Sequence, residues 1–155
     1  MPERDATATP PDSPRAAAKF RRPADEEVRR AARRLVRGGK AAFHSQARFR
    51  EALLSTLRRE EPLAVISGRR LRRLLIDVPG VRISVRYTER ESGSPLRACP
   101  ICGSELRPIH NQTLSGESVV LGQRCVHCDY WTHRARRVPV RYTITSAGID
   151  GRRRP

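Results

Sequence analysis

Four cysteines in two pairs carry the chemistry that is most clearly encoded in this chain. Cys99 and Cys102 form one C-x2-C pair, Cys125 and Cys128 form a second, and no other cysteine occurs. Each pair can present two thiolates from one tight turn, so the two pairs together can supply four sulfurs to a single ion. Zn²⁺ accepts tetrahedral all-thiolate ligation because its filled d shell imposes no geometry of its own. We therefore predict one structural Zn²⁺ ion held by these four side chains.

Other uses of the cysteines compete with this prediction. Two disulfides would suit a secreted chain, yet no hydrophobic signal segment precedes the pairs. A redox dithiol of the thioredoxin type needs one C-x2-C inside a βαβ pattern, which surrounds neither pair. A catalytic zinc would keep one position for water, whereas four cysteines close the shell. His110 and His127 are therefore expected to lie near the ion without binding it.

The residues between the two pairs are expected to form two strands. Segments 106–111 and 119–124 flank Ser115-Gly116, which is a strand, turn and strand pattern, and Gly103 suits the sharp turn after the first pair. The order of cysteine turn, strand, reversal, strand and cysteine turn resembles the zinc-ribbon family. Because so short a segment buries little apolar surface, metal binding is expected to supply its folding free energy.

The chain carries a large excess of positive charge, and this charge is unevenly distributed. There are 32 basic and 16 acidic side chains, for a formal net charge of +16. Residues 21–90 hold 19 basic and eight acidic groups, residues 134–155 hold seven and one, and residues 97–133 hold three of each. Such an excess is typical of a protein with a polyanionic partner, nucleic acid before membrane surface. A basic surface that serves only solubility is the alternative.

Composition also argues against several classes of protein. The longest aliphatic run, residues 63–66, is far shorter than the roughly 20 residues that cross a membrane. The acidic N-terminal residues do not fit a transit sequence, so we expect a cytoplasmic protein in a reducing compartment. No Ser/His/Asp set, carboxylate pair or glycine-rich phosphate loop stands out. We therefore expect no enzymatic activity and no small-molecule substrate.

The pattern predicts an α+β protein in four parts. Residues 1–23 are expected to be a disordered tail, 24–90 a basic helical region, 91–146 a zinc ribbon with flanking strand, and 147–155 a basic tail. Helices are predicted from residue 25 to the glycines at 38–39, over 46–60 with Ser45 as its cap, and over 68–77 with Ser67 as its cap, with a short strand at 63–66. In the third helix leucines face one way and four arginines the other, and this arginine face is our best candidate for phosphate contacts.

Two further strands show alternation of apolar and polar residues. Residues 81–88 and 138–145 both contain the tetrapeptide VRYT. We predict that these strands pair antiparallel beside the metal site, so that their arginine faces coincide. The candidate nucleic-acid contacts are Arg69, Arg70, Arg72, Arg73, Arg82, Arg86, Arg134, Arg136, Arg137 and Arg141. Trp131, the single tryptophan, is expected either to stack on a base or, as is more usual, to close the apolar side of the metal site.

Two resemblances extend these predictions. Helix, short strand, basic helix and amphipathic strand resemble part of a winged helix-turn-helix, which implies a helix in the DNA major groove. The third helix must then come from residues 25–37, and strand 81–88 lacks an immediate partner. The ribbon, with Leu106, Pro108 and Asn111 in the spacing C-x2-C-x3-L-x-P-x2-N, also resembles the zinc-ribbon subunit of archaeal and eukaryotic ribonuclease P, which implies an RNA partner.

Together these patterns predict a non-catalytic, zinc-binding, nucleic-acid-binding protein. A DNA-binding regulator of the transcription type is the first reading. An RNA-binding accessory protein of a ribonucleoprotein such as ribonuclease P is one alternative. The other alternative is an adaptor whose charge-neutral ribbon docks on a larger protein complex.

Overall fold

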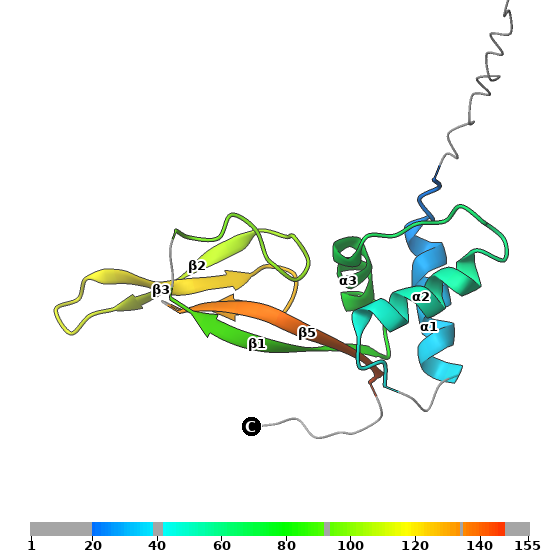
Figure 1. The fold of residues 1–155 in the computed structure, drawn as a ribbon. Coiled ribbons are helices and arrows are strands. Elements are labelled where there is room, and N and C mark those ends of the chain that lie inside the picture. Colours follow the sequence, from blue (N-terminus) through cyan, green and yellow to red (C-terminus); the bar gives the residue numbers. More distant parts are fainter. Residues whose placement is uncertain (1–19, 39–41, 92–93, 134, 148–155) are drawn as a thin grey trace, which may run out of the picture.

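The computed structural model of the chain describes residues 20–38, 42–91, 94–133 and 135–147. Most of the two predicted tails, together with Arg134, lies outside these residues. Three helices gather at one end of the molecule, and antiparallel strands extend away from them (Figure 1), so the fold class is α+β. The elements are α1 (Asp25–Gly38), α2 (Gln46–Leu57), α3 (Gly68–Ile76), β1 (Val81–Arg90), β2 (Leu106–Gln112), β3 (Ser118–Cys125), β4 (Trp131–Thr132) and β5 (Arg136–Ser146).

Side-chain caps set where the second and third helices begin. The Ser45 hydroxyl accepts a hydrogen bond from the Arg48 backbone N–H at the start of α2, and Ser67 does the same at the start of α3. Both predicted caps are confirmed. The prediction that the second helix reaches residue 60 is wrong, since α2 ends at Leu57. The backbone N–H groups of Glu60 and Glu61 both donate to the carbonyl of Leu57, and the chain turns there.

The strand predicted at residues 63–66 is also absent from the described part of the chain. Only Ala64 forms a bridge, parallel to Arg21, and the backbone of Arg21 bonds to Leu63 and Val65 at 2.9 Å each. The segment lies between Pro62 and the cap of α3, which leaves no room for a longer ladder. It therefore fastens the residues before α1 to the helical end of the molecule.

The three helices enclose one hydrophobic core. Phe49 and Leu53 of α2 and Leu71 and Leu75 of α3 are fully buried against the alanine and valine side of α1. Ile144 of β5 is also fully buried there. We call these helices with their core the helical unit.

The two strands that flank the cysteines pair with each other. β1 and β5 run antiparallel from Val81 opposite Ser146 to Arg90 opposite Arg136, with one irregularity after Arg86. Arg86 lies directly opposite Arg141, so the predicted pairing and the shared arginine face are both confirmed. On the other side of β5, Phe43 forms a bridge with Ile144, with hydrogen bonds of 2.8 and 2.9 Å.

The four cysteines lie in and beside a separate small sheet, which is inserted between β1 and β5. Its strand order is β2-β3-β4, with all pairs antiparallel. We call residues 94–133 the four-cysteine unit. Gly122 allows β4 to approach β3 closely, since a Cβ at this position would lie 1.9 Å from the carbonyl oxygen of Thr132. Among the described residues no helix has both the length and the apolar character needed to cross a membrane.

Candidate metal centre

The four cysteine sulfurs converge on one point. Their Sγ atoms all lie within 4.8 Å of one another, and the separations are 3.6 Å for Cys99 and Cys128, 3.5 Å for Cys102 and Cys125, and 3.7 Å for Cys102 and Cys128. These spacings exceed the roughly 2 Å of a disulfide, and the thiols are free. They match the edge of about 3.8 Å of a tetrahedron with metal–sulfur bonds of about 2.3 Å. The cysteines are positioned to bind one metal ion.

Backbone turns hold the sulfurs in this arrangement. Gly103 has a φ of 80°, the left-handed region that favours glycine, and its N–H donates to the carbonyl of Cys99. In the second turn the backbone N–H groups of His127 and Cys128 point at Cys125 Sγ, at 3.3 and 3.4 Å. These hydrogen bonds fix the direction in which the Cys125 sulfur points.

The thiols influence one another's ionisation. Hydrogen bonding from the Cys128 thiol lowers the pKa of Cys99, and the same contact raises the pKa of Cys128. Burial raises the pKa of Cys102. A cation bound by the four sulfurs would favour the thiolate form of each of them. Metal binding is thus coupled to proton release.

Tyr130 closes the apolar side of the centre. Its side chain is 1% exposed, packs with Ile101 and the cysteines, and donates a hydrogen bond to the carbonyl of Arg137 at 2.8 Å. Burial raises the pKa of Tyr130, so its hydroxyl stays protonated. The sequence prediction gave this role to Trp131, which is instead 41% exposed. Both residues follow Cys128, and only the strand register decides which of them points inward.

Neither histidine near the cysteines joins the sulfur cluster, which contains cysteines alone. His127 Nε2 lies 3.5 Å from a carboxylate oxygen of Asp77 at the end of α3, and His110 is exposed on β2 near Ser118. The His127 contact joins the second cysteine turn to the helical unit.

Arg72 is the main link between the helical unit and the first cysteine turn. Its guanidinium donates to the carbonyl of Ile101 at 2.6 Å, to the side chain of Gln46 at 2.6 Å and to the carbonyl of Pro100 at 3.4 Å. It also lies 4.3 Å from the centre of the Tyr142 ring. One side chain on α3 thus contacts α2, the metal-binding turn and β5.

The remaining arginines predicted to contact nucleic acid fall into two groups. Arg70 binds Asp25 and the carbonyl of Pro23, which lowers the pKa of Asp25, and Arg136 donates to the carbonyl of Ser94. Arg137 lies between two aromatic rings and is described below. The exposed arginines are Arg69, Arg73, Arg82, Arg86 and Arg141, while Arg134 is outside the described residues.

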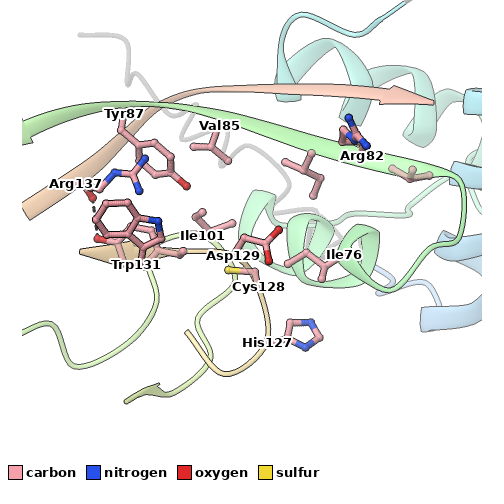
Figure 2. Close-up of a pocket in the computed structure, with 13 residues that line it drawn as sticks. Ile76, Arg82, Val85, Tyr87, Ile101, His127, Cys128, Asp129, Trp131 and Arg137 are labelled. Carbon is pink, nitrogen blue, oxygen red and sulfur yellow. Dashed lines mark hydrogen bonds between the residues drawn. The ribbon is translucent and has the colours of Figure 1, made fainter. Parts of the chain in front are cut away.

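A hollow of about 560 Å³ opens beside the metal centre, between α3, β1 and the second cysteine turn (Figure 2). Ile76, Val85 and Ile101 form its apolar floor, and His127 and Asp129 lie on its polar side. Arg137 stands between Tyr87 and Trp131 at one end. Burial raises the pKa of Tyr87 to about 12, so this ring carries no charge at neutral pH.

Comparison with protein-family models, with curated proteins and with solved structures finds no match for this chain.

Proposed function

We propose that this protein binds one structural Zn²⁺ ion and uses the rigid frame around it to bind duplex DNA, as a non-catalytic regulator of the transcription type. Four thiolates favour zinc over hard cations such as Mg²⁺ and leave no open position for chemistry at the ion. The excess of arginine supplies the attraction to phosphate. The two cysteine turns and the antiparallel strands between them support the assignment of a zinc ribbon.

The observation that carries the proposal is the order and pairing of the elements. A winged helix-turn-helix domain needs a core of three helices and a hairpin of two paired strands as its wing. Here α1, α2 and α3 pack together and are followed by the paired strands β1 and β5. The short strand expected at residues 63–66 does not form, and Phe43, between α1 and α2, bridges to β5 instead. The partner that strand 81–88 lacks in its immediate sequence is β5, because the four-cysteine unit is inserted between them.

The exposed side of α3 fits the role of the helix that enters the major groove. Leu71, Leu74 and Leu75 face the core, whereas Arg69 and Arg73 are exposed one turn apart. Arg70 and Arg72, on the two sides of the helix, are used to fix α3 in place. The two exposed arginines are therefore presented on a rigid helix, which suits them to contact bases or phosphates.

The open face of β1 and β5 supports the same partner. Arg86 and Arg141 lie directly opposite each other, and Arg82 is exposed on the same face of β1. Like charges directly opposite across an antiparallel pair destabilise the sheet. A phosphate backbone along this face would remove that cost, so we assign these arginines to backbone contacts that position the protein.

An RNA partner remains the second candidate function, and the resemblance to ribonuclease P is its basis. Leu106 packs against the buried cluster formed by the cysteines, Ile101 and Tyr130. Pro108 and Asn111 are exposed on β2, and the Asn111 side chain accepts a hydrogen bond from the backbone N–H of the next residue, Gln112. A third candidate is an adaptor whose four-cysteine unit docks on a larger protein complex. The next experiment distinguishes it from duplex DNA binding and from RNA binding.

Replacing Arg69 and Arg73 together with glutamine is expected to weaken binding to a mixed-sequence DNA duplex by about tenfold or more for each arginine. Titration of a fluorescent duplex at several salt concentrations would show a lower affinity and a shallower salt dependence. The matched control is Arg30→Gln with Arg34→Gln, a pair exposed at the same spacing on α1.

Equal losses in both double variants would mean that charge alone is read and that α3 has no special role. Tighter binding of structured RNA than of the duplex would favour the ribonucleoprotein candidate. No binding to either nucleic acid at low salt would overturn the proposal and leave the adaptor.

A further inference from the structure

Three residues on neighbouring strands form a row across one face of the four-cysteine unit. Arg107 of β2 lies directly opposite Arg124 of β3, and Arg124 lies directly opposite Trp131 of β4. Residues that are directly opposite in a sheet project from the same face. All three are exposed. We call Arg107, Arg124 and Trp131 the arginine–tryptophan row.

The row borders a hollow on the surface of the sheet. Its volume is about 570 Å³, and Ile109, Val126 and Tyr130 line it together with the arginine–tryptophan row. Trp131 also lines the hollow beside α3 and β1, so this residue separates the two hollows. A flat ligand that approaches this face of the sheet would meet the indole of Trp131, with the guanidinium groups of Arg124 and Arg107 following it along the row.

The indole is held in a fixed position from behind. The Arg137 guanidinium lies 4.3 Å from the centre of the Trp131 ring and 4.1 Å from the centre of the Tyr87 ring (Figure 2). His133 contacts the indole at an angle of 63°, with 4.6 Å between ring centres. Trp131 nevertheless remains 41% exposed. A large aromatic side chain that is both fixed and exposed costs little entropy when it binds a ligand.

We propose that the arginine–tryptophan row binds unpaired nucleotides, with a base stacked on Trp131 and the adjacent phosphates bound by Arg107 and Arg124. This surface is distinct from the duplex-binding residues of α3 and of β1 and β5, and the inference rests on the proposed function only in that both partners are nucleic acids. Alternation of aromatic rings and cationic side chains is how single strands are bound without sequence readout. Arg107 and Arg124 also repel each other across the strands, and a bound phosphate relieves this repulsion.

Two carboxylates lie next to the row and limit its affinity. Glu105 is 3.6 Å from the guanidinium of Arg107, and Asp129 lines the same hollow as Trp131. Neither carboxylate contacts Arg124 or Arg137 among the ion pairs of the described residues. Since Asp129 faces the space where a phosphate or base would lie, Asp129→Asn is expected to raise affinity for single strands severalfold.

The sole tryptophan makes this surface directly observable. Titration of the zinc-loaded chain with a short oligothymidylate is expected to quench the tryptophan emission, because stacking on a base quenches an excited indole. An oligonucleotide with the same number of phosphates but abasic sugars is expected to bind more weakly and to quench little. Polyglutamate supplies anions without bases, and equal quenching by it would overturn the proposal in favour of an acidic protein partner.

Affinity for a fluorescent oligothymidylate then tests the residues without relying on tryptophan emission. Trp131→Ala is expected to lose at least about fivefold in affinity, whereas Trp131→Phe keeps an aromatic surface and most of the affinity. Arg124→Gln is expected to lose affinity and to lower the salt dependence, and Arg50→Gln, exposed on α2, is the matched control.

Unchanged binding in Trp131→Ala, with normal zinc content, would overturn the row as a base-binding surface while leaving duplex binding intact. If the unchanged chain binds single strands but does not bind duplex DNA, only the function proposed for α3 would be overturned. The two proposals therefore fail in different experiments.

Discussion

Replacing Cys125 with serine is expected to release the bound ion and unfold the four-cysteine unit while the helices persist. Cys125 contributes one of four sulfurs, and its Sγ accepts two backbone N–H groups that shape the second turn. Besides the cysteines, only Ile101 and Tyr130 are buried in the cluster of this unit, so an ion bound there would supply most of its folding free energy. Metal analysis should show the loss of one equivalent of zinc.

The same variant is expected to lower the stability of the helical unit indirectly. Without the ordered insertion, β1 and β5 would be joined by a long flexible loop, whose closure costs on the order of 3 kcal/mol. Thermal unfolding followed by helical circular dichroism should therefore give a lower midpoint, and a chelator added to the unchanged chain should act in the same direction. His110→Ala, an exposed change in the same unit, is the control and should retain the zinc. A Cys125→Ser chain that keeps one zinc ion and its native spectra would contradict the assignment.

Replacing Arg72 with methionine is expected to loosen the connection between the helical unit and the metal centre. The carbonyls of Ile101 and Pro100 and the side chain of Gln46 would lose their charged donor, and Tyr142 would lose its stacked cation. Loss of hydrogen bonds from a partly buried charged group is expected to reduce the free energy of unfolding by about 2–4 kcal/mol.

Arg73→Met provides a matched control for this change. Arg73 is the next residue on α3 and is exposed, so its replacement should change the free energy of unfolding by less than about 0.5 kcal/mol. Denaturant titration of both variants measures the difference. Hydrogen exchange of the backbone amides of residues 99–104 gives a second readout, because faster exchange there in Arg72→Met shows a loosened turn. Equal free energies of unfolding for the two variants would mean that the hydrogen bonds of Arg72 do not stabilise the fold.

Patterns that repeat along the chain could be predicted from sequence. Two C-x2-C pairs specify their own turns, and the alternation in the two VRYT strands places arginines on one face wherever the strands pair. Ser45 and Ser67 identify helix starts because a capping hydroxyl acts within three residues. Each of these signals is local, and the structure agrees with each of them.

Features that depend on long-range contacts could not be predicted. Arg69, Arg70, Arg72 and Arg73 form one continuous basic pattern in the sequence, yet two of them are engaged by Asp25 and by the Ile101 carbonyl from distant segments. The identity of the inward aromatic residue depends on the register of a two-residue strand. The sequence does not single out Arg107 and Arg124, because the neutral net charge of residues 97–133 does not show how side chains are distributed between the two faces of the sheet.

The position of Ile144 has a consequence for biosynthesis. This side chain completes the core around Phe49, although it follows the whole four-cysteine unit in the chain. A ribosome therefore releases three helices and β1 well before the residue that seals them. Part of the core of the nascent helical unit therefore stays exposed to solvent until the four-cysteine unit has been synthesised and β5 has paired with β1.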